Sequence, residues 1–413
     1  MRPTGVIIHG GGAAANSFWR GVCLAGTRVG GKVGALWEPH VEAPRARVPS
    51  RLMRSRSLFP FALVFSLVAA VLSAGQGTSP SNQTVERSPV ELPQEKRLRN
   101  VRQLTDGGEN AEAYFSGKGE RLIFQSKRDG AECDQIYTMR ADGSDVRMVS
   151  TGKGRTTCSY FFPRGGRILY SSTHLASEKC PAPPDYSRGY VWAVYPSYDI
   201  FTAREDGSDV RRLTKAEGYD AEATMSVDGR RIVFTSMRDG DLDIYTMDAD
   251  GRNVKRLTNE PGYDGGPFFS RDGRLIVYRA NHPKTPEQVA RYRKLLAENL
   301  VEPNALEIWV MNADGSNKRQ VTSLGVASFA PYFLPDGKRI IFSSNYPSIR
   351  SRDFNLFVVG VDGKGLEQVT FNDTFDGFPM FSPDGRRLVF ASNRHAAVRG
   401  DTNVFIADWA EKE

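Results

Sequence analysis

The sequence predicts an all-β fold, a six-bladed β-propeller whose blades are antiparallel sheets of four strands. The first observation is a short line that starts with Arg and continues with aliphatic and aromatic residues. It occurs six times, at Arg121–Ser126, Arg167–Ser172, Arg231–Ser236, Arg274–Arg279, Arg339–Ser344 and Arg387–Ser392. Runs of this length and composition are typical of strands, and repetition at this period is typical of a radial propeller.

A second line follows each copy and predicts a third strand. It begins at Gln135, Asp199, Asp243, Glu307, Asn355 and Asn403. In five of the repeats this line runs into an Asp-Gly turn, at Asp142, Asp206, Asp250, Asp314 and Asp362. Asp-Gly favours a tight hairpin, so a fourth strand is expected after each of these turns.

The two ends of the repeat array complement each other. The sixth repeat ends at Trp409 without a fourth strand, whereas Val101–Thr105 resembles the fourth strands Val210–Thr214 and Val254–Thr258. We therefore expect Val101–Thr105 to lie along Asn403–Ala407 and to complete the last blade. Such closure also removes exposed sheet edges, which would invite aggregation.

The sequence before the propeller indicates export. Residues 1–52 are rich in Gly, Ala and Arg, and we interpret them as a gene-model extension, the alternative being an unusual N-terminal segment. Residues 53–75 combine a basic start, an apolar run and small residues, the pattern of a secretory signal peptide. Residues 76–98 are expected to form a disordered tether, and the propeller to span 99–410. We predict a periplasmic or secreted protein that is not integral to a membrane after cleavage of the signal.

The distribution of charge gives no support to nucleic-acid binding. The chain has a formal net charge of +7, and the nine basic and two acidic residues within 1–57 account for all of it. The rest of the chain is therefore neutral overall. A nucleic-acid-binding domain would need a basic surface, so no nucleic-acid partner is expected.

Two blades carry insertions between their second and third strands, at 174–197 in blade 2 and 281–304 in blade 4. The first is rich in Pro and aromatic residues, including Tyr190 and Trp192. The second predicts a helix at 286–299, because a capping-box sequence precedes an apolar stripe at helical spacing. We expect that stripe to pack on the propeller.

The turn between the first and second strands carries a motif of its own. It reads Ser-Pro-Asp-Gly at Ser382–Gly385, with variants at Ser226–Gly229, Ser270–Gly273 and Leu334–Gly337. In this motif and its repetition, residues 101–409 resemble the TolB-type propeller family. The resemblance implies the fold but not one function, because similar repeats occur in Tol–Pal proteins, in the caps of serine peptidases and in polysaccharide lyases. TolB proteins carry a further domain before the propeller, for which this chain leaves no room, so a Tol-system accessory role is only a third alternative.

Strand order assigns the loops to two faces. The turns between strands one and two and between strands three and four share one face, which we call the turn face. The loops between strands two and three, with both insertions, share the other, which we call the insertion face. Binding residues usually lie on loops of a rigid scaffold. We therefore predict that the insertion face binds the partner and that the turn face holds little besides tight turns.

Two sets of residues, together with Tyr190 and Trp192, make up the predicted binding site on the insertion face. One set follows the second strands: Arg128, His174, Arg238, His282, Tyr346 and Arg394. The other stands at the start of the first strands: Asn110, Glu112, Asp220, Glu222, Asp264 and Asp376.

A structural interpretation of these residues comes first. Glu112 with Arg128, and Glu222 with Arg238, would then be ion pairs that hold loops within one blade. In blades 2 and 4 the Arg is replaced by His174 and His282, and the matching acid by Ser159 and Gly266. Histidine can ligate a metal or transfer protons near neutral pH, but a hydrogen-bonded loop histidine fits the pattern too.

Three cysteines, Cys133, Cys158 and Cys180, are expected on the insertion face of blades 1 and 2. In an exported protein we first expect a disulfide, with the pairing left open. The alternative is zinc held by these three thiolates and His174, a possible tetrahedral set. No other cofactor is expected.

These features predict an exported, non-enzymatic propeller that binds a protein or a glycan-like partner on the insertion face, as a monomer. No Gly-x-Ser-x-Gly motif of an attached hydrolase occurs in the sequence. The alternative from another class is a metal-dependent enzyme similar to polysaccharide lyases. It would use His174, His282, Asp264 and Asp376 as ligands or acid–base groups.

Overall fold

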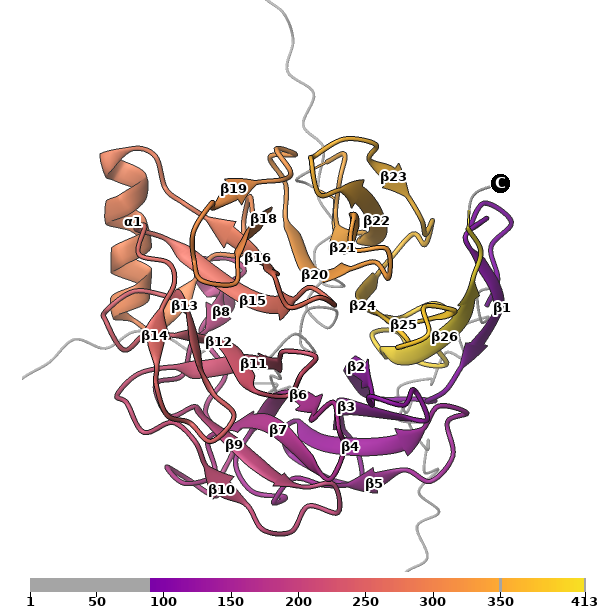
Figure 1. Cartoon of the computed structure of the whole chain (residues 1–413), viewed down its shortest axis with the longest axis horizontal. Coiled ribbons are helices and arrows are strands. Elements are labelled where there is room, and N and C mark those ends of the chain that lie inside the picture. Colours follow the sequence, from indigo (N-terminus) through magenta and orange to yellow (C-terminus); the bar gives the residue numbers. More distant parts are fainter. Residues whose placement is uncertain (1–89, 349–350, 412–413) are drawn as a thin grey trace, which may run out of the picture. The chain divides into compact units, whose positions relative to one another are not determined.

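The computed structural model describes residues 90–348 and 351–411, which form a six-bladed β-propeller (Figure 1). Each blade is a sheet of four antiparallel strands, so the predicted fold class is confirmed. The predictions for residues 1–52, for the signal peptide at 53–75 and for most of the tether lie outside the described residues.

Each blade has its first strand at the propeller axis and its fourth strand at the outer edge, and in blades 1 to 5 this fourth strand is short (Figure 1). Blades 1 to 3 consist of β2 (Glu109–Phe115), β3 (Arg121–Lys127), β4 (Gln135–Arg140) and β5 (Arg147–Met148); β6 (Thr156–Phe161), β7 (Arg167–Ser172), β9 (Asp199–Arg204) and β10 (Arg211–Arg212); and β11 (Asp220–Met225), β12 (Arg231–Ser236), β13 (Asp243–Asp248) and β14 (Lys255–Arg256).

Blades 4 to 6 follow the same plan. They consist of β15 (Tyr263–Phe269), β16 (Leu275–Asn281), β18 (Glu307–Asn312) and β19 (Arg319–Gln320); β20 (Ser328–Phe333), β21 (Arg339–Ser344), β22 (Asn355–Gly360) and β23 (Glu367–Gln368); and β24 (Asp376–Phe381), β25 (Arg387–Ser392), β26 (Asn403–Trp409) and β1 (Leu98–Gln103).

The second strands are apolar along nearly their whole length because each blade is covered on both faces by its neighbours. Phe124, Phe234, Phe342 and Phe390 occupy one level of four different blades, and each is fully buried. Burial of such a side chain stabilises the fold by about 1.5–3 kcal/mol. This two-sided burial explains why the repeated line shows no apolar–polar alternation.

Every innermost strand contains one β-bulge at the same level. The register with the second strand shifts once in each blade, and one residue at that point adopts a positive φ between 50° and 60°. These bulge residues are Glu112, Cys158, Glu222, Gly266, Ala330 and Phe378. All six line one small cavity on the propeller axis, which we call the axial cavity. The bulges therefore direct one residue of every blade toward the centre of the ring.

The two insertions meet. β8 (Trp192–Ala193) of the blade 2 insertion pairs with β17 (Leu300–Val301) of the blade 4 insertion in a two-stranded antiparallel sheet. Helix α1 (Pro286–Ala297) begins with the predicted capping box, in which Thr285 accepts a hydrogen bond from the backbone N–H of Gln288. Its apolar stripe packs against the same cluster as the insertion sheet, so the predicted helix and its packing are confirmed.

The ring closes as predicted. β1 pairs antiparallel with β26, with Arg102 opposite Ile406 and Gln103 opposite Phe405. The backbone N–H of Leu104 continues the ladder by donating to the carbonyl of Val404 at 2.8 Å. The N-terminal strand of the propeller thus completes the last blade.

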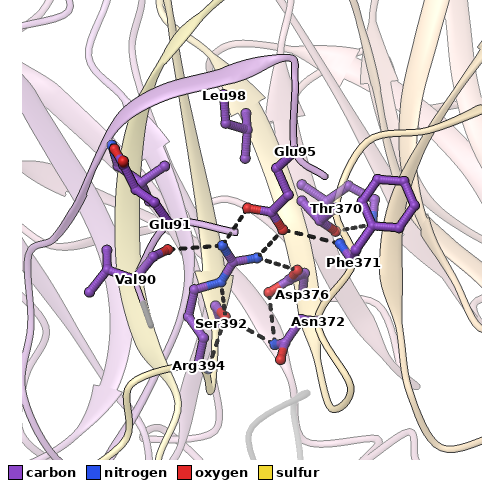
Figure 2. A network of polar contacts seen from close by, with 12 residues as sticks. Val90, Glu91, Glu95, Leu98, Thr370, Phe371, Asn372, Asp376, Ser392 and Arg394 are labelled. Atoms are coloured by element: carbon purple, nitrogen blue, oxygen red, sulfur yellow. Dashed lines mark hydrogen bonds and ion pairs between the residues drawn. The ribbon is translucent and has the colours of Figure 1, made fainter. Parts of the chain in front are cut away.

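A buried ion network reinforces this closure (Figure 2). Arg394 donates to both carboxylate oxygens of Glu95, at 2.7 and 2.8 Å, and to Asp376 at 2.7 Å. The side chains of all three residues are at most 1% exposed. Glu95 also accepts from the backbone N–H of Phe371 at 3.1 Å. The segment before β1 is therefore held to blades 5 and 6 by charge as well as by the sheet.

We predict that Arg394→Met lowers the free energy of unfolding by about 3–5 kcal/mol, because it leaves two buried carboxylates without their cation. Denaturant unfolding monitored by circular dichroism measures this change. Arg386→Met, at an exposed position on the turn between β24 and β25, is the matched control and should change stability by less than about 0.5 kcal/mol. Equal stability of the two variants would contradict a structural role for the network.

Candidate functional site

Most residues of the two predicted sets on the insertion face contact each other within single blades. In four blades, the first polar residue of the inner strand pairs with the residue that follows the second strand. The pairs are Asn110–Arg128 at 3.1 Å, Asp220–Arg238 at 2.9 Å, Asp264–His282 at 2.9 Å and Asp376–Arg394 at 2.7 Å. These contacts hold the loop after the second strand against the start of the first.

The predicted ion pairs Glu112–Arg128 and Glu222–Arg238 are wrong. Their acids are bulge residues, so the bulge turns each carboxylate toward the axis, while the residue two positions earlier meets the Arg. The expected loss of an acid beside His282 is also wrong, because Asp264 fills that role. In blade 2 the residue at the level of Glu112 is Cys158 and not Ser159.

The two histidines lie in different surroundings. His174 contacts Ser172 Oγ through Nδ1 at 2.7 Å and packs on Phe201, and burial together with the charge of Lys153 lowers its pKa. For His282, burial opposes the charged form, but the hydrogen bond to Asp264 and the charge of that carboxylate outweigh it and raise the pKa. The structure thus gives His282 an acid partner and His174 a neutral one.

The remaining predicted site residues belong to the insertions or to one loop. Trp192 is buried, at 7% exposure, and its indole N–H donates to the hydroxyl of Tyr190 at 2.7 Å. Tyr346, in the loop after β21, is 40% exposed. Of these three, Tyr346 is the most exposed, Tyr190 is half-buried and Trp192 is buried.

The insertions cover the axis on the insertion face. Their sheet shares one apolar cluster with Ala330 and Phe378, which also line the axial cavity. Trp192 packs edge-on against Tyr263 and Phe329. The centre of the predicted binding face is therefore filled by the protein's own aromatic residues.

A charged cluster surrounds the axial cavity, whose volume is about 30 Å³. Arg279 forms an ion pair with Glu222, donates to the hydroxyl of Tyr263 at 2.6 Å, and lies over the ring of Trp192 at 5.2 Å. Arg279 thereby links the inner strand of blade 3, its own blade 4 and the insertion sheet.

The repeated pattern did not single out Arg279, because the second strand of blade 4 is shifted by one residue relative to the second strands of the other blades. Strand pairing places Arg279 opposite Ile308, at the level held by Gln125, Ser171, Thr235, Ser343 and Ala391 in the other blades. A single charged residue among five neutral ones was the available signal.

Within this cluster, the carboxyl group of Glu112 has a raised pKa. Burial, and next the negative charge of Glu222, raise its pKa from 4.5 to about 7, against the opposing charge of Arg279. Cys158 contributes a hydrogen bond that favours the charged form. The axial cavity therefore holds a carboxyl group that takes up a proton near neutral pH.

The cysteines resolve into one disulfide and one thiol. Cys133 is bonded to Cys180, which joins a loop of blade 1 to the blade 2 insertion, and Cys158 is free and buried. The alternative zinc set is therefore not formed, because two of its four ligands are bonded to each other. Among residues 90–348 and 351–411, no group of three or more His, Cys, Asp or Glu side chains is arranged to hold a metal ion.

The turn face, where the sequence predicts little but turns, carries a cavity of about 280 Å³ on the axis, which we call the turn-face cavity. All six blades contribute to it. Its mouth is formed by the second residue of each turn between strands one and two: Gly117, Pro163, Val227, Arg271, Pro335 and Pro383. The packing is tight between blades 1 and 2, since a Cβ on Gly117 would lie 2.0 Å from the carbonyl oxygen of Pro163.

Aromatic rings form the floor of the turn-face cavity. Tyr160 and Tyr332 line this cavity. Behind them lie Tyr114 and Phe268, and the ring centroids of these four residues are 5.4–6.2 Å apart where they are in contact. Tyr160 and Tyr332 share a side-chain hydrogen bond, and burial raises the pKa of Tyr332 to about 12. This aromatic layer separates the turn-face cavity from the axial cavity, which Tyr114 and Phe268 line.

The fold and the two axial cavities define a six-bladed propeller with a capped insertion face and an open turn face. Residues 195–294 match the family described as TolB beta propeller domain (PD40). Over these residues the repeats thus match the TolB type, as the repeated turn predicted.

A curated relative, a Protein TolB homolog of Chlorobium luteolum, is 23% identical over 145 residues, which cover 30% of this chain and 33% of that protein. The match thus spans about a third of the relative's length. Among solved structures, TolB from Acinetobacter baumannii superposes with a TM-score of 0.50 at 17% identity, covering 72% of this chain and 65% of that one.

A putative TolB from Agrobacterium tumefaciens superposes with a TM-score of 0.47 at 18% identity, covering 74% of this chain and 91% of that one. At these identities the structural likeness concerns the fold. Within the described part of the chain, no helix has the length and the apolar character needed to cross a membrane.

We predict that Glu112→Gln changes the pH dependence of stability. Because the folded pKa of about 7 exceeds the unfolded value of 4.5, the protonated carboxyl contributes stability that is complete below pH 4.5 and lost as the pH rises through about 7. The glutamine variant stays neutral, so its stability relative to wild type should grow by about 2–3 kcal/mol between pH 5 and pH 8.

Denaturant unfolding at several pH values measures this difference. Glu120→Gln, at an exposed turn position, controls for the loss of one carboxylate and should follow the wild-type profile. A difference between Glu112→Gln and wild type that stays constant over this pH range would contradict the assignment.

We predict that the double variant Cys133→Ser with Cys180→Ser loses about 2–4 kcal/mol of unfolding free energy, because the disulfide restricts the unfolded chain. Thermal unfolding with and without a reducing agent checks this prediction. The reductant should lower the wild-type Tm to that of the variant and leave the variant unchanged. A wild-type Tm that does not respond to reduction would count against the disulfide.

Proposed function

We propose that the protein is an exported, non-enzymatic propeller scaffold that binds a segment of a protein partner in the turn-face cavity. The TolB-type propeller supports the scaffold, and the cavity supports the location. The location differs from the sequence-based prediction because the insertions fill the centre of the insertion face and six turns leave a cavity at the opposite end of the axis.

The observation that carries the proposal is the chemical character of the cavity wall. Apart from Arg271, its few polar side chains are already engaged within the fold. Ser116 Oγ accepts from the backbone N–H of Arg121 at 3.1 Å, Ser382 Oγ accepts from that of Arg387 at 2.9 Å, and Tyr160 bonds to Tyr332.

Such a wall offers apolar and aromatic contact but few hydrogen bonds. A polyhydroxylated sugar would need a wall rich in unengaged donors and acceptors, since each unpaired polar group costs free energy on burial. Apolar side chains of a peptide, in contrast, gain free energy simply by burying their surface against such a wall. The cavity therefore favours a protein partner over a glycan, and it offers no paired acid and base for catalysis.

Two further features support export. The Cys133–Cys180 disulfide is of the kind that forms in oxidising compartments, and the signal-peptide pattern at 53–75 agrees with it. The proposed location is accordingly the bacterial periplasm or the exterior of the cell.

Blocking the mouth of the cavity tests this proposal. Val227 is 53% exposed at the mouth, so Val227→Trp should fill the opening without disturbing the core. Val254, 41% exposed near the outer strand of the same blade, provides the matched control Val254→Trp. Short peptides selected from a displayed library on the wild-type protein should bind Val254→Trp equally well and should bind Val227→Trp at least tenfold more weakly.

Peptides that bind all three proteins equally would place the binding surface elsewhere. Tyr346→Ala then tests the insertion face, where the residues predicted from the sequence remain a candidate surface. Loss of binding in Tyr346→Ala, with normal binding in Val227→Trp, would return the site to the insertion face. Turnover of uronate polymers, seen as absorbance of an unsaturated product, would contradict the non-enzymatic assignment.

A further inference from the structure

The mouth of the turn-face cavity contains one charge. Of the six mouth residues, five are Gly, Pro or Val, and the sixth is Arg271. Arg271 is also the one charged residue among all those that line the cavity. Because the rest of the wall is apolar or aromatic, Arg271 is the one charged side chain that an occupant of the cavity would meet.

The positive charge of Arg271 is not neutralised within the described residues, where its exposed guanidinium forms no ion pair or side-chain hydrogen bond. The adjacent acid serves its own turn: Asp272 accepts from Ser270 Oγ at 2.6 Å and from the backbone N–H of Arg274 at 3.0 Å. Asp228 on the neighbouring blade is held in the same way by Ser226 Oγ at 2.6 Å.

The field of Arg271 reaches the floor of the cavity. Its positive charge acts to lower the pKa of Tyr332, although burial dominates and raises that pKa overall. An occupant resting on the aromatic floor would therefore lie within the influence of the guanidinium. An anionic group on that occupant could form charge-assisted hydrogen bonds with the planar donor array of Arg.

Resting on the proposed function, we infer that the partner segment inserts an apolar or aromatic side chain into the turn-face cavity and places a carboxylate against Arg271. The carboxylate belongs to an acidic residue next to the apolar one or to the C-terminus of the partner. Arg271 then selects for this arrangement, while the floor and the Pro-rich walls supply most of the contact area.

N-acetylphenylalanine and its amide are suitable probes, because they differ in a single charge. NMR titration of the wild-type protein at low salt should show the acid binding about tenfold more tightly than the amide, since one charge-assisted hydrogen bond is worth that factor or more. Added salt should reduce this preference. Arg271→Ala should bind the acid and the amide alike, and Arg271→Lys should keep part of the preference.

Arg230→Ala is the matched control, because Arg230 is an exposed arginine on the corresponding turn of blade 3 but does not line the cavity. It should retain the wild-type preference. Persistence of the preference in Arg271→Ala, or its loss in Arg230→Ala, would overturn the inference.

Failure of the inference and failure of the proposed function give different results. If acid and amide bind equally to wild type and both are blocked in Val227→Trp, the cavity stands as the site and the carboxylate is overturned. If neither probe binds at millimolar concentration, or if both still bind Val227→Trp, the cavity itself is overturned as the site.

Discussion

The rest of this structure depends on the closure of the ring, because every blade packs against the blade on either side of it. The last sheet takes three strands from one end of the propeller and β1 from the other. Sheet pairing alone would leave the segment before β1 loosely attached. The buried contacts of Arg394 with Glu95 and Asp376 fix that segment, and both carboxylates bond to the guanidinium, so that no charged group of the network is buried without a partner.

Closure also determines what lies on the axis. Six inner strands brought to one centre cannot all remain regular, and each contains a bulge at the same level. The bulges send side chains of very different size and charge to the centre, and Arg279 compensates the acid of blade 3 from blade 4. Above this level the insertions seal one end with aromatic residues, and below it the tyrosine and phenylalanine layer floors the open end. The asymmetry between the two faces thus follows from which loops were lengthened.

Local patterns in the sequence sufficed for the fold. The repeated lines, the fourth-strand likeness of Val101–Thr105 and the capping box at Thr285 each report on a few adjacent residues, and the structure agrees with all three. The site depended on features that such patterns do not record. A one-residue bulge moved Glu112 and Glu222 away from their expected partners, and a one-residue shift concealed Arg279. The pairing of the two insertions joins segments about a hundred residues apart, and the turn-face cavity exists only where six separate turns converge.

The order of the strands along the chain has a consequence for biogenesis. β1 is made first and β26 last, so the final sheet cannot assemble until nearly the whole propeller has left the ribosome. Contacts between such distant segments form slowly, so the nascent polypeptide stays incompletely folded for longer. Under the export proposed above, this delay would postpone compaction until translocation is complete.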